Sequence, residues 1–307
     1  MTTDFGVVPD LTPEQEHESG APALEAASER RAARRGFLVA LPSFAYLVIF
    51  FAIPLVIVLV YSFATRNPRG ITELRDWNVE AYRALAEPLL RSVLVRTLVL
   101  ALLTTVICLA LSYPFAYYMA TRDSEVVRTL LLIGVMIPFW SNFLVRTYVI
   151  RVLLSSSGPL SEASQSIGLG EVDIAFSNAA VLIGLVYGFL PFMILPLYAA
   201  LERIDWNLVE AARDLYASGW KAFRRVVWPL SRPGVVAGCI LVFVPSFGAY
   251  VTSDILGGAK NPLFGNYIVN QFLQARDWPA GAAVSVVILA VMLIGTLVYF
   301  RTGGRTL

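Results

Sequence analysis

The sequence predicts an all-α integral membrane protein with six transmembrane helices. Its 307 residues are 57% apolar and only 15% charged, and their mean hydropathy is +0.67. Soluble domains are about 45–50% apolar and about 25% charged. Six apolar runs each come close to the roughly 20 residues that span a bilayer core. Backbone groups in lipid must find hydrogen-bond partners within their own segment, so we expect helices in these runs.

The chain begins with a polar segment, residues 1–36, which we expect to be a disordered cytoplasmic tail. Acidic residues between Glu14 and Glu29 precede a basic cluster that ends at Arg35. The segment does not resemble a secretory signal, because the apolar run after it is too long and no A-x-A cleavage site ends that run. Residues 37–307 are expected to form one transmembrane domain.

The apolar runs are separated by polar connections and contain no Asp or Glu. In the fourth run, Gly184 and Gly188 have the spacing of a helix face that packs closely against another helix. The six runs cover residues 37–64, 97–118, 129–150, 179–201, 233–251 and 280–300.

Two runs carry signals for a broken helix. The third contains Pro138 and, toward its end, Asn142 and Arg146. We therefore expect it to be kinked and to face partly inward. The fifth is interrupted by Pro245-Ser246-Phe247-Gly248, and broken helices at such depth usually line a cavity.

The longest polar segment between two apolar runs is residues 202–233, where we expect two short helices. Asp205 is a suitable N-cap for the first, because its carboxylate can accept hydrogen bonds from the free N–H groups of the first turn. The pair Ser218-Gly219 interrupts the helical pattern. Pro229 and Pro233 are expected to close the segment, since proline disrupts a helix interior. A helical hairpin with small residues on one face is suited to docking into a groove of another protein.

This segment also resembles the EAA loop of ATP-binding-cassette importer permeases, in which a coupling helix fits a cleft of the ATPase subunit. Glu210-Ala211-Ala212 and Pro229 stand in register with the family pattern. The family glycine is replaced by Tyr216, the isoleucine by Val226 and the leucine by Trp228. The resemblance implies the six-helix type I (MetI-like) permease fold. It implies these ATPase-coupling residues: Glu210, Ala211, Ala212, Leu215, Tyr216, Gly219, Val226 and Pro229.

Three further stretches resemble polyamine-type permeases: residues 137–148, 245–252 and 254–266. The run Leu256-Gly257-Gly258-Ala259-Lys260-Asn261 is similar to the B-type of the two permease subunits in spermidine/putrescine importers. The same run can also be a Gly-rich turn that joins the last two helices. The resemblance covers most of residues 37–307. It implies a permease subunit for a polyamine such as spermidine or putrescine, with opines, iron and aminophosphonates as other substrates of this importer class.

The resemblance also implies partners: a second, C-type permease subunit, two ATPase subunits and an external solute-binding protein, all assembled at the bacterial cytoplasmic (inner) membrane. The chain has no G-x-x-x-x-G-K-[ST] run, so a partner subunit is expected to hydrolyse ATP and this chain is not expected to be an enzyme. No cofactor is expected. Cys108 and Cys239 lie far apart within apolar runs, which favours packing roles over a disulfide or a metal site.

The main alternative is an ion-coupled secondary transporter, which usually buries acidic residues near the bilayer midplane. The six runs contain none. A membrane enzyme and a simple membrane scaffold rank below both transport interpretations.

The distribution of Lys and Arg favours a cytoplasmic N-terminus, because a basic cluster directly precedes the first apolar run. Six arginines between Arg66 and Arg96 count against this orientation, since they would then lie outside. With the N-terminus inside, residues 202–233 also lie in the cytoplasm, within reach of an ATPase.

A polyamine carries several positive charges, yet the apolar runs offer no carboxylate. Either the path holds its substrate weakly and leaves selection to the binding protein, or aromatic rings and freed carbonyl groups attract the cation. The aromatic candidates could equally face lipid. Arg146 would repel a cation, so we expect it to face away from the path or to pair with an acidic neighbour. The candidate path residues near Pro138 and Pro245 are Phe139, Trp140, Asn142, Phe143, Phe247 and Tyr250.

Overall fold

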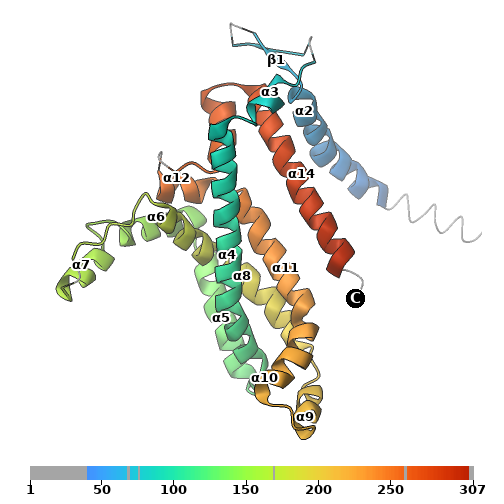
Figure 1. Ribbon diagram of the computed structural model, residues 1–307, viewed down its shortest axis with the longest axis vertical. Helices are drawn as coiled ribbons and strands as arrows, with labels where there is room; N and C mark the ends of the chain where they lie inside the picture. The colour runs from blue at the N-terminus through green and yellow to red at the C-terminus, as the bar shows by residue number, and fades with distance from the viewer. Residues whose placement is uncertain (1–39, 68–69, 75–76, 169, 259–260, 304–307) are drawn as a thin grey trace, which may run out of the picture. The chain divides into compact units, whose positions relative to one another are not determined.

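The computed structural model describes residues 40–67, 70–74, 77–168, 170–258 and 261–303. The tail expected at residues 1–36 lies outside the described residues. The chain divides into two compact units, Met1–Val58 and Leu59–Leu307, which are described separately. Within the described residues, five helices are long and apolar enough to cross a membrane, and a pair of helices bent by 91° is a sixth candidate. Figure 1 shows the helices coloured in chain order.

A helix runs from Ala40 to Tyr61, and its residues up to Val58 are the described part of the first unit. It contains the π-helical segment η1 (Val48–Ala52), followed by α2 (Ile53–Tyr61). The N–H of Ile53 donates to the carbonyl of Val48, one residue further back than in an α-helix. This wider turn comes directly before Pro54, whose ring would collide with the carbonyl four residues earlier in a regular helix.

In the second unit, three long helices pack against one another and form the centre of the core (Figure 1): α4 (Pro88–Ala120), α8 (Asn178–Glu202) and α11 (Trp228–Phe247). Met193 and Leu197 of α8 and Val242 of α11 are fully buried among them. The bounds of α8 confirm the expected run within one residue at each end. α4 begins much earlier than expected, at Pro88, because the helix continues through Arg91 and Arg96.

Small residues allow α8 to approach its neighbours closely. A Cβ atom added to Gly184 would lie 2.2 Å from Cδ1 of Leu256, and one added to Gly238 of α11 would lie 2.6 Å from the sulfur of Met193. The predicted close-packing face is therefore confirmed at Gly184. At Gly188 the nearest atom, on Phe143, would be 3.9 Å away, which is ordinary contact.

The second helix of the polar segment continues into the fifth apolar run. α10 (Gly219–Ala222), the π-helical segment η2 (Phe223–Val227) and α11 form one helix from Gly219 to Phe247. The expectation that Pro229 and Pro233 close the segment is therefore wrong. The N–H of Trp228 donates to the carbonyl of Phe223, which widens the turn before Pro229 as it does before Pro54 and lets the helix continue.

The third apolar run is two helices instead of one kinked span. α5 (Glu125–Trp140) and α6 (Phe143–Leu153) meet at 91°, and α7 (Pro159–Ser166) follows. The chain turns at Ser141, which is extended, and at Asn142, which caps α6, whereas Pro138 lies within the last turn of α5. The break is thus sharper than the expected kink and lies after the proline.

The fifth run is interrupted where the sequence predicts. α11 ends at Phe247, and α12 (Val251–Gly257), α13 (Phe264–Val269), η3 (Asn270–Gln274) and α14 (Trp278–Gly303) follow. Thr97 of α4 fixes α13: its Oγ1 atom donates to the carbonyl of Val93 at 2.8 Å and accepts the N–H of Phe264 at 3.0 Å.

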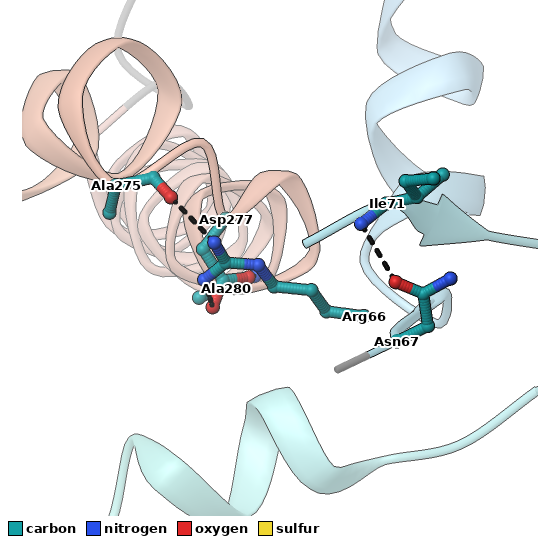
Figure 2. Close-up of polar contacts among 6 residues, drawn as sticks. All are labelled: Arg66, Asn67, Ile71, Ala275, Asp277 and Ala280. Atoms are coloured by element: carbon teal, nitrogen blue, oxygen red, sulfur yellow. Dashed lines mark hydrogen bonds and ion pairs between the residues drawn. The ribbon is translucent and has the colours of Figure 1, made fainter. Parts of the chain in front are cut away.

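Between α2 and α4, a short antiparallel pair, β1 (Thr65–Arg66) and β2 (Thr72–Glu73), precedes α3 (Glu80–Ala84). The turn between the strands is held by Asn67, whose Oδ1 atom accepts the N–H of Ile71 at 2.9 Å (Figure 2).

Arg66 joins this connection to the start of the last long helix. Its Nη2 atom donates to the carbonyl of Ala275 at 2.9 Å, as Figure 2 shows, and its Nη1 atom lies 3.5 Å from Oδ2 of Asp277. The other carboxylate oxygen of Asp277 accepts the N–H of Ala280 at 3.1 Å, in the manner of a helix N-cap. One of the six arginines that count against the expected orientation is therefore paired within the chain.

Candidate functional site

A helical hairpin, residues 205–222, connects α8 to the continuous helix that contains α11. Its first helix is α9 (Asn207–Asp214) and its second is α10. Asp205 Oδ1 accepts the N–H of Asn207 at 3.1 Å, so the carboxylate serves the first turn as predicted. Ser218 caps α10 by accepting the N–H of Lys221 at 3.4 Å. The predicted pair of helices is confirmed, although the second does not end at the prolines.

Tyr216 has a left-handed backbone, with φ of +59°. Around it, the N–H of Ala217 donates to the carbonyl of Ala212 at 3.1 Å and the N–H of Tyr216 to that of Arg213 at 2.9 Å. These are the two hydrogen bonds of a Schellman motif, whose left-handed position is usually glycine. Tyr216 stands where the EAA pattern has glycine. The substitution therefore changes the side chain while the conformation that favours glycine is kept.

The coupling residues predicted from the sequence fall into two groups. Leu215 and Tyr216 are 82% and 97% exposed, and Glu210, Ala211 and Gly219 are exposed beside them. The other three are half-buried and lie at the base of the hairpin: Ala212, Val226 and Pro229. The exposed apolar surface also includes Trp220 at the start of α10.

An aromatic cluster, which we call the anchor, holds the hairpin against α4. Phe223 lies at its centre: its ring centroid is 5.7 Å from that of Tyr113, 6.1 Å from that of Tyr117 and 5.4 Å from that of Trp220. The hydroxyl of Tyr113 also lies 2.8 Å from the hydroxyl of Ser231 in α11. Sequence reasoning missed the anchor, although the four-residue spacing of Tyr113 and Tyr117 places both on one helix face. Trp206 and Trp228 complete the cluster through Tyr117 and Tyr113.

The sharp turn between α5 and α6, residues 138–146, is called the elbow. Two side chains donate to the carbonyl of Pro138: the Ser141 hydroxyl at 2.7 Å and Nη1 of Arg146 at 3.0 Å. Asn142, a predicted path residue, caps α6 instead: its Oδ1 atom accepts the N–H groups of Leu144 at 2.8 Å and Val145 at 3.4 Å.

Arg146 folds back over aromatic rings of the elbow and of α8. Its Cζ atom lies 5.7 Å from the ring centroid of Phe139, 5.6 Å from that of Phe143 and 5.6 Å from that of Tyr187. Neither ion pair of the described residues includes Arg146. The expected pairing with an acidic neighbour is therefore not found among the described residues, and the orientation of Arg146 relative to the substrate path stays a prediction. These rings can stabilise the guanidinium without an acidic partner, since the cation–π attraction of one ring contributes roughly 0.5–2 kcal/mol of free energy.

The other candidate path residues do not gather at one place. Trp140 is 81% exposed, whereas Phe247 is 1% exposed and belongs to a core cluster with Phe264 and Val284. Tyr250 is half-buried at the start of α12. The structure thus brings Phe139 and Phe143 together around one guanidinium, whereas Phe247 lies in a core cluster and Tyr250 at the start of α12.

The stretch similar to the B-type permeases holds the loop before α8. The Nδ2 atom of Asn261 donates to the carbonyl of Phe176 at 3.1 Å, and Gly258 has a left-handed φ of +59°. The guanidinium of Arg151 in α6 lies 4.7 Å from the ring centroid of Phe176. The glycine-rich stretch lies at the end of α12 and before α13, within the connection that joins the last two long helices, α11 and α14. Ala259 and Lys260 lie outside the described residues.

Long apolar helices, a broken helix pair and a capped polar hairpin indicate a multi-pass helical membrane protein. Across residues 30–302 the chain matches the family described as binding-protein-dependent transport system inner membrane component, and it belongs to that family. It is therefore the permease of an ATP-binding-cassette importer. Within the described residues, no group of three or more His, Cys, Asp and Glu side chains could hold a metal ion.

Relatives and solved structures agree with this family. The chain is 43% identical over 258 residues to the spermidine/putrescine transport system permease protein PotB of Escherichia coli (strain K12), covering 83% of this chain and 93% of that one. It is 42% identical over 260 residues to the protein of the same name from Haemophilus influenzae, covering 84% and 90%. A chain from the crystal structure of a bacterial transporter involved in the import of alginate superimposes with a TM-score of 0.73 at 17% identity, covering 91% of this chain and 99% of that chain. At that identity the likeness concerns the fold.

Proposed function

We propose that this chain is the B-type permease subunit of a polyamine importer and moves spermidine or putrescine across the bacterial inner membrane. The observation that carries the proposal is the 43% identity to spermidine/putrescine permeases over 83% of the chain. The elbow agrees with it, because aromatic rings and the carbonyl of Pro138 already accommodate one organic cation there, the guanidinium of Arg146. The absence of carboxylates from the six apolar runs argues against the rival interpretation, an ion-coupled transporter.

In this proposal an ATPase subunit docks on the hairpin. Leu215, Tyr216 and Trp220 are large apolar side chains, 68–97% exposed, at a position where this family couples to its ATPase. The anchor ties the hairpin to α4, and η2 continues it directly into α11. A movement of the ATPase that displaces the hairpin would therefore move the adjoining ends of α4 and α11 as one rigid body. This movement would change the side of the membrane to which the path between two permease subunits is open.

The proposed topology counts the bent pair α5–α6 as one span, which gives six spans with the N-terminus and the hairpin in the cytoplasm. The partners are a C-type permease, two ATPase subunits and an external solute-binding protein. A similar fold supports the last of these: a structure of a bacterial alginate transporter in complex with its ligand-bound periplasmic protein has a TM-score of 0.67 and 16% identity.

Uptake by the complete importer tests the proposed substrate. The chain, its partner permease, its ATPases and its binding protein are expressed together in a bacterial strain that lacks polyamine uptake. We expect ATP-dependent accumulation of radiolabelled spermidine or putrescine, and loss of accumulation when the ATPase is inactive. Uptake that follows an ion gradient without ATP would contradict the importer, whereas ATP-dependent uptake of an opine, iron or an aminophosphonate would replace only the substrate.

Cysteine labelling tests the proposed topology in intact cells. In a chain without Cys108 and Cys239, we expect an impermeant maleimide to label Ile167→Cys, which is 72% exposed as isoleucine, but not Ser218→Cys in the hairpin. As a control, both positions should be labelled after the cells are permeabilised, because the maleimide then reaches both sides of the membrane. External labelling of Ser218→Cys would reverse the orientation.

A further inference from the structure

The elbow, which holds most of the path residues expected from the sequence, contains a cation of its own. Arg146 donates to the carbonyl of Pro138 at 3.0 Å, and its guanidinium lies within 5.6–5.7 Å of three ring centroids. These rings come from α5, α6 and α8, so the guanidinium fills the angle between the broken pair and its neighbour. The side chain is only half-buried, which leaves room for it to move.

Among the residues that the structure describes, no acidic group forms an ion pair with Arg146. The two ion pairs of the described residues are Arg66–Asp277 and Arg128–Glu202. Contacts to rings and to a carbonyl oxygen are the same contacts that an ammonium group would make. The guanidinium and a substrate cation therefore compete for one set of partners, and their like charges oppose joint occupancy.

We propose that Arg146 is a resident cation that occupies the elbow until a substrate cation displaces it, and that this competition sets selectivity for polycations. Because Arg146 is tethered, its effective concentration at the elbow is high, and a monoamine competes poorly. A polyamine brings further ammonium groups to the region, so it can displace the guanidinium and repel it. The inference rests on the proposed function, since it assumes a cationic substrate.

Two neutral variants test the competition. Arg146→Met keeps an unbranched apolar stem without the charge, and Arg146→Gln replaces the guanidinium by a shorter neutral side chain that still carries N–H donors. The complete importer complex, without its binding protein, is reconstituted in nanodiscs. We then measure equilibrium binding of radiolabelled putrescine and of radiolabelled butylamine. Butylamine has the same four-carbon chain as putrescine but carries only one ammonium group. We expect both variants to bind putrescine about tenfold more tightly than the wild type does. We also expect both variants to bind butylamine measurably, whereas the wild type should show no measurable butylamine binding.

Arg151→Met is the matched control, because Arg151 belongs to the same helix and lies over the ring of Phe176, away from the elbow. It should bind both amines like wild type. Arg146→Lys, which restores a tethered cation, should again discriminate against butylamine.

Unchanged binding in Arg146→Met and Arg146→Gln, with both complexes recovered intact, would overturn the inference. Failure of both variants to assemble would also overturn it, because Arg146 would then be a fixed structural element. The proposed function fails separately, if wild-type importer with its binding protein accumulates no polyamine.

Discussion

Nη1 of Arg128 lies 3.4 Å from Oε1 of Glu202, and the hydroxyl of Tyr198 donates to the same carboxylate oxygen at 2.7 Å. The contact joins the beginning of α5 to the last residue of α8. α5 leads to the elbow, and the end of α8 carries the hairpin. The pair therefore connects the end of α8, which precedes the hairpin, to α5, which carries Phe139 of the elbow, by a route that does not pass through the anchor.

Breaking this pair should affect transport more than stability. We expect Glu202→Gln to lower ATP-driven uptake several-fold, because it removes the charge and keeps an acceptor for Tyr198. The free energy of unfolding should change by no more than about 1 kcal/mol, since exposed ion pairs contribute little. Uptake by the reconstituted importer and its apparent melting temperature measure the two effects. The exchange Arg128→Glu with Glu202→Arg should recover part of the uptake, and wild-type uptake in Glu202→Gln would exclude the connection.

Tyr216→Gly should stabilise the hairpin. A left-handed backbone costs a residue with a Cβ atom about 1–2 kcal/mol, and glycine removes most of this cost. We expect the amide of Ala217 to exchange with deuterium about fivefold more slowly, as a gain of about 1 kcal/mol implies. Tyr216→Ala is the control, because it removes the ring and keeps the Cβ atom. Equal exchange in the glycine and alanine variants would mean that the side chain, and not the backbone, determines hairpin stability.

Ala211 and Ala212 are adjacent, yet they should respond differently to a bulky side chain. Ala211 is exposed, whereas Ala212 is half-buried and contacts the core beneath the hairpin. Ala211→Trp should weaken association with the ATPase and leave the hairpin folded. Ala212→Trp should destabilise the hairpin itself by about 1–3 kcal/mol, the usual cost of overpacking, and abolish uptake while membrane insertion continues. Co-purification of the ATPase and hydrogen exchange in the hairpin separate the two. Normal uptake and recovery in both would remove the docking assignment.

Gly184→Ala should destabilise the second unit. The new Cβ atom would lie 2.2 Å from Cδ1 of Leu256 and 3.0 Å from Cγ2 of Thr252, so α12 must shift away from α8, at about 1–3 kcal/mol. Gly134→Ala in α5 is the control: nothing lies within 4 Å of its added Cβ atom, and alanine favours a helix by about 1 kcal/mol over glycine. Thermal unfolding in detergent should therefore show a lower apparent melting temperature for the first variant and an equal or higher one for the second. A drop of the same size in both would mean that contact with α12 is not the cause.

The sequence predicts the long helices well because their apolar side chains lie together along the chain. α8 is accurate at both ends, since Ser177 accepts the N–H of Ala180 and caps its start, and polar residues follow Leu201. α4 is underestimated, because Arg91 and Arg96 lower the local hydropathy without ending the helix. Proline is a poorer guide, because Pro138 and Pro229 both lie within helices. A π-turn before Pro229 relieves the clash there, whereas the helix that contains Pro138 ends two residues after it.

The candidate site is harder to predict because its contacts join distant parts of the chain. The hairpin could be found from local capping residues and from Glu210-Ala211-Ala212. The anchor could not, since Tyr113 and Phe223 meet only when α4 packs against α11. Arg146 illustrates the same limit: its charge suggested an acidic partner, and the folded chain supplies three rings and a carbonyl group in its place.

The length of α4 has a consequence for how the protein meets its lipid. At 33 residues the helix is about 50 Å long, while hydrocarbon is about 30 Å thick. Immersing the whole helix would require a tilt of roughly 50°, outside the usual range of about 0–40°. Its first turns, with Arg91 and Arg96, must therefore stand in the headgroup layer or in water. In a thicker bilayer the hydrocarbon core would extend to Arg96 before it extends to Arg91. Arg96 therefore limits how much of α4 can lie within the hydrocarbon core.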